Sequence, residues 1–205
     1  TINKIEVWVT NKSSNFTDSR NILALQDLGE HDPHIYNQVP SFQEIQGLPF
    51  PDNIYPDNDV NGLYKEMATT HSAIRQIQSI TSELAQFGND FIGGRDFEKI
   101  EQARMLTPSE YRVNERLGYI SLNNSLSNDE ILAVAFNFTV NGKVYQVGEF
   151  SNEGIDAPQT LILKLIKGTN LSPRFPTWNL MMKNIYNLNA YELTNEDFFL
   201  NVMYL

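Results

Sequence analysis

The stretch DNDVNG comes closest to a known site, because its side chains follow the spacing of a calcium-binding loop. Asp57, Asp59, Asn61 and Gly62 match positions one, three, five and six of an EF-hand loop. Position twelve, which should carry a bidentate glutamate, is Ala68. A turn that leads into a helix explains the same residues, and we favour that interpretation over calcium binding.

A second group of potential metal ligands lies in the stretch GEHDPHIY. His31 and His34 have the spacing of a transition-metal pair, with Glu30 and Asp32 beside them. Such a site needs further ligands on a rigid support, whereas Pro33 predicts a turn between the two histidines. We therefore interpret these residues as a solvated loop and predict no metal site.

Paired carboxylates could supply an acid and a nucleophile for glycoside hydrolysis. Asp129 with Glu130, and Glu149 with Glu153, are candidate pairs. Their proximity in sequence does not set their separation in space, and we expect them at solvated edges. The chain contains no G-x-S-x-G, Walker A or G-x-G-x-x-G motif, and FIGGRDF is typical of a turn. We predict no catalytic residues, no cofactor and no enzymatic activity.

Aromatic side chains could bind carbohydrate, but Trp8 and Trp178 are better explained as core or interface residues. The chain has 205 residues, 41% of them hydrophobic, which predicts a folded domain with a substantial core. Its net charge of -10 disfavours nucleic acid and anionic membranes as partners. The absence of cysteine excludes disulfides and thiolate metal sites. No apolar run is long enough for a transmembrane helix.

The N-terminal region predicts strands and then a long loop. Residues 4–11 alternate, with Ile5 on one face and Trp8 on the other, which indicates a half-buried strand. Residues 20–30 fit a second strand or a short helix. Five of the nine prolines fall in residues 31–60, which predicts a meandering Pro-rich loop with a docking role.

The clearest predicted helix covers residues 62–87, capped by Asn61 and ended by Gly88. Apolar residues recur along it at intervals of three and four, forming a stripe of Leu63, Met67, Thr70, Ile74, Ile77, Ile80, Leu84 and Phe87. A shorter helix is predicted for residues 97–104. A further helical turn is expected from Ser109.

The stretch LAVAFNFTVNGKVYQVGEF predicts a β-hairpin around a type I′ turn at Asn141 and Gly142. A two-residue turn sets the register, which pairs Val140 with Lys143, Phe138 with Tyr145, Phe136 with Val147 and Asn137 with Gln146. The face with Ala133, Ala135 and Gly148 has only small side chains at these positions. We expect the long helix to pack there, and an exposed surface or a partner protein would also fit this face.

Residues 160–168 predict another strand, and a helix capped by Thr177 should follow. The apolar face of that helix would consist of Trp178, Met181, Met182 and Ile185. The fold class expected is α+β, with a mixed, mainly antiparallel sheet and one long and one or two shorter helices packed on it. Both ends have strand patterns, so we expect residues 1–205 to be a single soluble domain excised from a much larger chain.

Three blocks, in order, resemble the SprA/Sov family of Bacteroidota. They are KIEVWVTN with RNILALQDLGE, then LTPSEYRVNERLGYISLNNSLSNDEILAVAFNFTVNGKVYQVGEF, then LKLIKGTNLSPRFPTWNLMMKNIYNL. Members of this family are giant outer-membrane gliding-motility proteins that form the translocon of the type IX secretion system. The resemblance spans nearly the whole chain, and residues 31–59 and the predicted long helix are its least distinctive parts.

The resemblance implies a non-catalytic domain inserted between strands of a giant β-barrel pore and lying outside the lipid. It would shape or cover the pore or dock partner subunits, facing either the periplasm or the cell surface. Expected partners are the remainder of the same chain, other secretion-system subunits and secreted cargo. We hypothesise that the Pro-rich loop and the small-residue face near Ala135 and Gly148 are contact surfaces.

Two other classes of function remain open from the sequence. One is an independent cell-surface carbohydrate-binding or hydrolytic module, which would bind a polysaccharide through exposed Tyr or Trp. The other is a structural module stabilised by calcium at residues 57–62.

Overall fold

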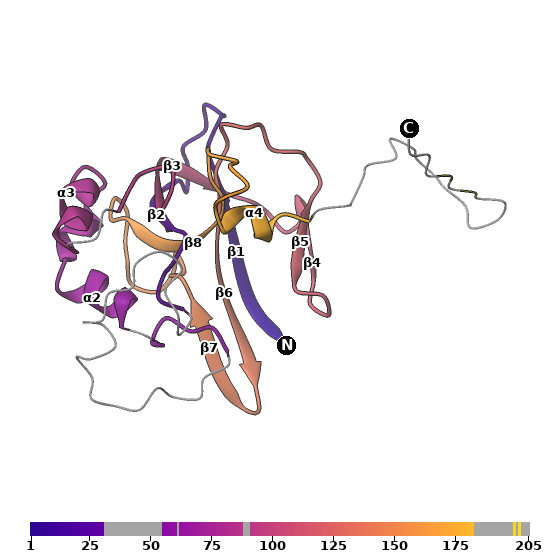
Figure 1. Cartoon of the computed structure of the whole chain (residues 1–205), viewed down its shortest axis with the longest axis horizontal. Helices are drawn as coiled ribbons and strands as arrows, with labels where there is room; N and C mark the ends of the chain where they lie inside the picture. The colour runs from indigo at the N-terminus through magenta and orange to yellow at the C-terminus, as the bar shows by residue number, and fades with distance from the viewer. Residues whose placement is uncertain (31–54, 61, 88–90, 183–198, 200, 202–205) are drawn as a thin grey trace.

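The computed structural model describes residues 1–30, 55–60, 62–87, 91–182, 199 and 201. This part of the chain is mainly β, with a closed barrel at its centre and a few short helices (Figure 1). The predicted mixture of strands and helices is therefore confirmed only in its coarse form. The long helix is absent from the described residues, and the sheet closes on itself.

The barrel is a ring in which each strand pairs with two neighbours. Its strands are β1 (Ile2–Val9), β3 (Phe97–Met105), β2 (Arg20–Leu25), β8 (Leu161–Lys167) and β6 (Leu132–Val140) in that order, and β6 pairs back onto β1. The β2–β8 pair is parallel and the other pairs are antiparallel. A sixth strand, β7 (Lys143–Val147), pairs with the second half of β6.

Both faces are buried along β2, most of β8, the second half of β1 and the first half of β6, whereas β3 has several exposed residues. The alternation along β1 predicts only half of this burial. Trp8 points into the barrel, whereas Val7 and Val9 point outward beneath another element. The interior is filled by side chains from all five strands and their connections, namely Trp8, Ile22, Ala24, Ile100, Ala103, Ile131, Ala133, Ala135, Phe150, Leu161, Leu163 and Leu165. Residues 20–25 resolve as a strand rather than a helix.

Two separate elements cover the outside of the barrel on opposite sides (Figure 1). One is the helical arch, residues 63–87, made of α2 (Leu63–Thr69), η1 (Ser72–Arg75), α3 (Ile80–Leu84) and η2 (Ala85–Phe87). The other is a hairpin of β4 (Tyr111–Asn114) and β5 (Tyr119–Leu122). A last short helix, α4 (Thr177–Leu180), contacts β8.

The prediction of one long helix over residues 62–87 is wrong, although most of its apolar stripe is correct. Six stripe residues are buried against the barrel, but Thr70 is exposed. The helix ends first at Thr69, since His71 is not helical with ψ 48°. A second break follows at Gln76, which is extended with ψ 116°, next to the Arg75 carbonyl that accepts a hydrogen bond from the Thr160 amide at 2.9 Å. Gly62, with φ 79°, begins the first helix, while Asn61 and Gly88 lie outside the described residues.

The helix predicted for residues 97–104 is also wrong, because this segment is the barrel strand β3. Buried Phe97, Ile100 and Ala103 are three apart, which imitates a helix. In the strand, Phe97 and Ile100 face opposite sides, one under the helical arch and one in the barrel. A bulge near Gln102, where φ is 52°, returns Ala103 to the interior. The turn expected from Ser109 leads into β4 instead of a helix.

The β6–β7 hairpin is confirmed in register and in its turn. Phe138 pairs with Tyr145, and Asn141 and Gly142 have φ values of 50° and 81°, as a type I′ turn requires. The prediction that the long helix packs on the small-residue face is wrong. Ala133 and Ala135 are fully buried inside the barrel among Trp8 and Phe150, because the sheet curls around this face before any helix can reach it.

Gly148 lets the chain leave β7 close to β6, and we predict that replacing it destabilises the domain. Its φ is 77°, and a Cβ atom there would lie 3.2 Å from the Ala135 Cβ and 3.2 Å from the Val134 carbonyl oxygen. Gly148→Ala should lower the free energy of unfolding by about 2–3 kcal/mol, measured by urea denaturation. Gly154→Ala is the control, since its φ is 80° but nothing lies within 4 Å. Equal losses in the two variants would contradict the close approach.

The C-terminal predictions are confirmed in part. The strand predicted for residues 160–168 is β8, and a helix follows at Thr177. Pro176, not Thr177, is the residue that precedes the helix, and the helix ends at Leu180 because Met181 is extended with ψ 138°. Ile185 and most of the Pro-rich loop, residues 31–54, lie outside the described residues.

Candidate functional site

Glu149, at the end of β7, is the most deeply buried carboxylate with a charged partner. Its side chain is 3% exposed and accepts two hydrogen bonds of 2.6 Å from Arg75 of the helical arch. It also accepts bonds from the Tyr64 hydroxyl at 2.8 Å and the Ile162 amide at 2.7 Å. Arg75 further donates to the Thr160 carbonyl at 2.9 Å. These bonds join β7, β8 and the helical arch at one point.

The electrostatics of this cluster favour a fixed ion pair over a proton donor. Burial raises the pKa of the Tyr64 phenol, and the adjacent Glu149 carboxylate raises it further. Burial opposes the charge of Arg75, but the bonds to Glu149 outweigh it, so that its pKa is raised. The Tyr64 phenol and the Arg75 guanidinium therefore both stay protonated near neutral pH. The sequence analysis named Glu149 as a candidate carboxylate, but it paired Glu149 with Glu153 and did not predict Tyr64 and Arg75 as its partners.

A second buried pair joins β8 to the segment that follows β2. The Lys164 ammonium donates to the Glu30 carboxylate and to the Gln26 carbonyl oxygen. Glu30 also accepts a hydrogen bond of 2.7 Å from the Leu28 amide. Glu30 therefore has a structural role, which is to anchor the segment after β2 to β8. The three potential ligands predicted beside it, His31, Asp32 and His34, lie outside the described residues.

A loop of residues 150–160 packs Phe150 and Ile155 against the barrel interior. The Arg20 side chain holds this loop by binding its backbone carbonyls. The Arg20 guanidinium donates to the carbonyl oxygens of Ser151 and Ile155, the former at 3.0 Å. Burial lowers the pKa of Arg20, although Asp156 opposes the effect. Gln159 supplies a third carbonyl at 3.4 Å. These contacts engage both terminal nitrogens of the guanidinium with peptide groups of the loop, whereas its buried Nε has no hydrogen-bond partner among the described residues.

The carboxylate pairs considered for hydrolysis do not share a site. Glu149 is buried, which corrects the expectation of a solvated edge, whereas Glu153 is exposed and accepts a bond of 2.8 Å from Gln146. Asp129 is exposed and pairs with Lys12 at 3.1 Å. Glu130 accepts a bond from the Ser127 amide at 2.6 Å. Lys12 also lies 3.7 Å from Glu130, so that Asp129 and Glu130 share this partner, and all four carboxylates are engaged in structural contacts.

Residues 57–60, which match the start of a calcium-binding loop in sequence, connect β7 to the helical arch. The Asp57 amide donates to the Glu30 carbonyl at 3.1 Å, and an Asp57 carboxylate oxygen accepts from the Gln146 amide at 3.4 Å. Asn58 binds both backbone groups of Gly148 with its side chain, at 2.8 and 3.1 Å. Asp57 and Asn58 thus cover part of the free edge of β7. Among the described residues, no three acidic or histidine side chains gather in a possible metal site.

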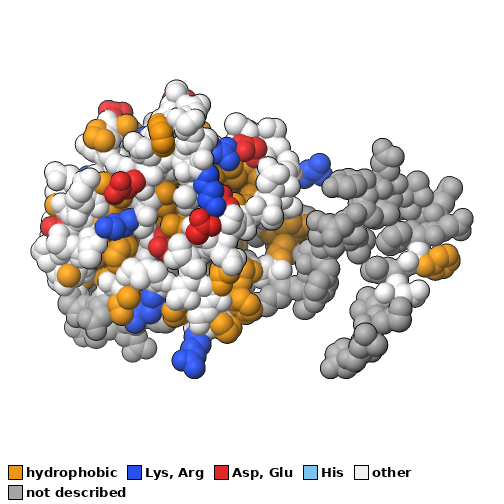
Figure 2. Space-filling model, turned by 90° about the horizontal axis from the view of Figure 1, so that it is seen from above, with side chains coloured by type: hydrophobic (Ala, Val, Ile, Leu, Met, Phe, Trp, Pro, Cys, Tyr) orange, Lys and Arg blue, Asp and Glu red, His pale blue; other side chains and the backbone are white. Residues whose placement is uncertain are grey.

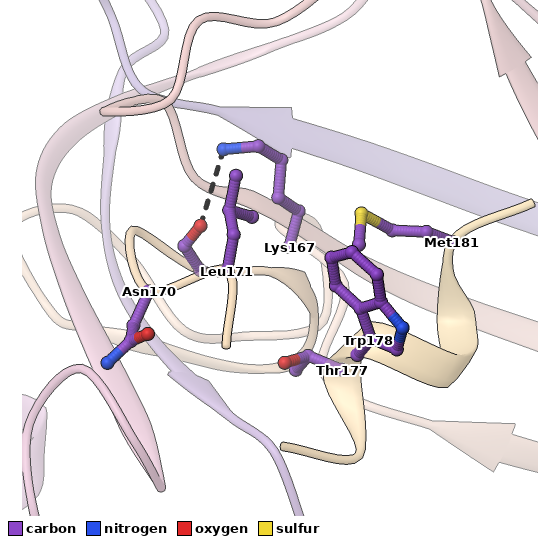
Figure 3. Close-up of a pocket in the computed structure, with 7 residues that line it drawn as sticks. Lys167, Asn170, Leu171, Thr177, Trp178 and Met181 are labelled. Atoms are coloured by element: carbon purple, nitrogen blue, oxygen red, sulfur yellow. Dashed lines mark hydrogen bonds between the residues drawn. The ribbon is translucent and has the colours of Figure 1, made fainter. Parts of the chain in front are cut away.

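A small hollow lies between the end of β8 and α4 (Figure 3). Its lining consists of Lys167, Gly168, Asn170, Leu171, Thr177, Trp178 and Met181. The hollow leaves no room for a water molecule. The Lys167 ammonium is turned to backbone carbonyls, including those of Asn128 at 3.1 Å and Gly168 at 3.3 Å. Burial lowers the pKa of Lys167. This hollow is a packing seam, and it places Trp178 at an interface as expected.

The outer face of the β6–β7 hairpin has a row of stacked aromatic rings. We define the hairpin surface as Tyr55, Phe136, Phe138, Val140 and Tyr145, which share this face. The Phe138 ring lies 6.0 Å from Phe136 and 5.4 Å from Tyr145, and Tyr55 lies 5.4 Å from Tyr145. Most of these side chains are half-buried rather than enclosed. The hairpin extends past the other barrel strands (Figure 1).

The charged side chains follow no such pattern on the face seen in Figure 2. There, acidic and basic side chains are interspersed, with hydrophobic ones between them. The hairpin surface is therefore the best candidate for a functional site, and its chemistry suits apolar contact. Within the part of the chain that the structure describes, no helix is both long and apolar enough to span a bilayer.

Comparison of the chain with known protein families and with curated protein sequences found no match.

Proposed function

We propose that this chain is a non-catalytic domain of a giant outer-membrane protein translocon of the type IX secretion and gliding-motility system. It acts at the periplasmic or cell-surface side, where it docks partner subunits or other parts of the same chain beside the pore. The proposal starts from the resemblance to the SprA/Sov family. The fold and the hairpin surface add physical support.

The blocks that resemble the family form the packed elements of the domain. The block LTPSEYRVNERLGYISLN contains β4 and β5, whose residues Tyr111, Ile120 and Leu122 cover the outside of β1 and β6. The block PTWNLMMKN contains α4, which packs against β8. The resembling blocks therefore lie in the packed scaffold of the domain. A scaffold that positions a surface is what a docking domain needs.

The hairpin surface is the observation that carries the proposal. Aromatic rings bury a large area at a small cost in conformational entropy, and they dominate the energetics of many protein interfaces. Stacking on Tyr145 and an edge-to-face contact with Tyr55 fix the Phe138 ring in advance, which lowers that cost further. The buried charges are bonded within the domain, at Glu149 and at Glu30. Function through apolar contact with a partner therefore fits the hairpin surface better than chemistry on a bound substrate.

The test is a substitution on the hairpin surface in the full-length protein. Phe138→Ser should reduce co-purification of the other secretion subunits and impair export of cargo, because it removes the central ring of the surface. Val144→Ser is the matched control, since Val144 is 56% exposed on the opposite face of the same hairpin. Circular dichroism of the two domains should show that both remain folded.

Normal export and normal co-purification in the Phe138 variant would contradict the proposal. Binding of a polysaccharide by the isolated domain, lost in the same variant, would favour the alternative of an independent carbohydrate-binding module at the cell surface.

A further inference from the structure

Three side chains with complementary chemistry meet where β1 begins. The Lys4 ammonium lies 2.5 Å from the Asn152 side-chain oxygen and 3.2 Å from a carboxylate oxygen of Glu6. The Glu6 side chain is only 8% exposed. The same ammonium lies 3.9 Å from the centroid of the Phe150 ring, which is fully buried. An amine, a carboxamide and a buried carboxylate thus share one site with an apolar wall.

Strand β1 and the hydrogen bonds around Ser151 hold these groups together. Lys4 and Glu6 are two apart on β1 and point to the same side of the strand. The Ser151 amide and hydroxyl both donate to Glu6, at 3.0 and 3.1 Å, which places the next residue, Asn152, beside Lys4. The Trp8 indole also donates to Glu6 at 3.3 Å. The carboxylate is therefore fixed from three directions.

We propose that Lys4 and Asn152 form an intramolecular isopeptide bond, with Glu6 as the catalytic proton carrier. Glu6 takes a proton from the Lys4 ammonium, and the freed electron pair of Nζ attacks the carboxamide carbon of Asn152. The carbon–nitrogen bond of the carboxamide then breaks as Glu6 returns the proton to the departing nitrogen. The ammonium and the carboxamide become a secondary amide and an ammonium ion, so atoms and charge balance without any oxidant or other reactant.

The geometry supplies what this reaction needs. The Lys4 nitrogen lies at hydrogen-bond distance from the Asn152 side-chain oxygen, so the amine is held beside the carboxamide that it would attack. The buried Glu6 carboxylate touches the nucleophile, as a general base must. The Phe150 ring excludes water from one side of the amine. Asn152 is exposed, which gives the released ammonia a path to solvent.

The bond would have a clear structural effect. It would join β1 to the loop of residues 150–160, between residues 148 positions apart. A cross-link over so long a segment restricts the unfolded chain far more than the folded one. The chain has no cysteine and so cannot form a disulfide for this purpose. This inference does not depend on the proposed function.

The test is the intact mass of the purified 205-residue chain, measured at once and after prolonged incubation. We expect a mass lower than that of the sequence by one ammonia molecule, and a tryptic peptide in which the segments around Lys4 and Asn152 are joined. An unchanged mass at both times would overturn the proposal. So would a loss of ammonia that peptide mapping places at Asn141 and Gly142, where a cyclic imide can form instead.

Two variants separate the roles of the residues. Lys4→Arg keeps the positive charge, but its guanidinium is a poor nucleophile, so this variant should retain the full mass. Glu6→Gln keeps the size of the side chain but cannot carry the proton, and it should also retain the full mass while remaining folded by circular dichroism. A cross-linked peptide forming in Glu6→Gln as fast as in the unmodified chain would show that Glu6 has no catalytic role.

Discussion

Replacing Glu149 by alanine should destabilise the domain by about 3–5 kcal/mol, because it leaves the Arg75 charge buried without its partner. The Tyr64 hydroxyl and the Ile162 amide would lose their acceptor at the same time. The loss should appear as a lower midpoint in urea denaturation followed by circular dichroism. Since Glu149 joins β7, β8 and the helical arch, hydrogen exchange should rise first in residues 63–87.

The control for this prediction is Glu153→Ala. Glu153 lies in the same region of the chain, but it is exposed, and its side chain accepts a hydrogen bond from Gln146. Its replacement should change the free energy of unfolding by no more than about 0.5 kcal/mol. The double variant Glu149→Gln with Arg75→Met should be more stable than Glu149→Ala, because it removes the unpaired charge. A loss below 1 kcal/mol in Glu149→Ala would mean that the ion pair does not hold the helical arch.

Replacing Trp8 by alanine should cost about 3–5 kcal/mol, because it leaves a cavity in the interior of the closed barrel. Trp8 is 1% exposed and packs among side chains from the other barrel strands. Its indole also donates to Glu6, which the smaller side chain would leave with one partner fewer. Urea denaturation followed by circular dichroism measures the effect, and tryptophan fluorescence should then report Trp178 alone.

Phe16→Ala gives the comparison for the Trp8 variant. Phe16 is a large aromatic residue of the β1–β2 connection, but it is 51% exposed. Its removal should change stability by about 0.5 kcal/mol or less. Similar losses in the two variants would be inconsistent with a barrel whose interior is built around Trp8.

The β6–β7 hairpin could be predicted from the sequence because every determinant is local. Asn141 and Gly142 define the turn, and the turn defines the register of the strands around it. The strands β1 and β8 could be recognised for a similar reason, since alternation or a short apolar run is visible within each of them.

The two incorrect helices show where local patterns are ambiguous. Buried residues three apart indicate a helix, but a strand buried on both faces with a bulge produces the same spacing in residues 97–105. In residues 62–87, the apolar stripe correctly predicted burial. It could not predict the two breaks in the helix, the second of which lies next to the Arg75 carbonyl that accepts a hydrogen bond from the Thr160 amide. Both the strand pairing of residues 97–105 and the contact with Thr160 involve segments far away in the sequence.

The candidate sites divide in the same way. The sequence by itself determined the composition of the core, the hairpin with its aromatic face, and the lack of cysteine. Only the tertiary structure decided that Ala135 lies inside a barrel, that Glu149 meets Arg75, and that Lys4 meets Asn152. Turns and strand faces depend on neighbours along the chain. Closure of a barrel and pairing of buried polar groups depend on which distant segments come together, and a one-dimensional pattern does not contain that information.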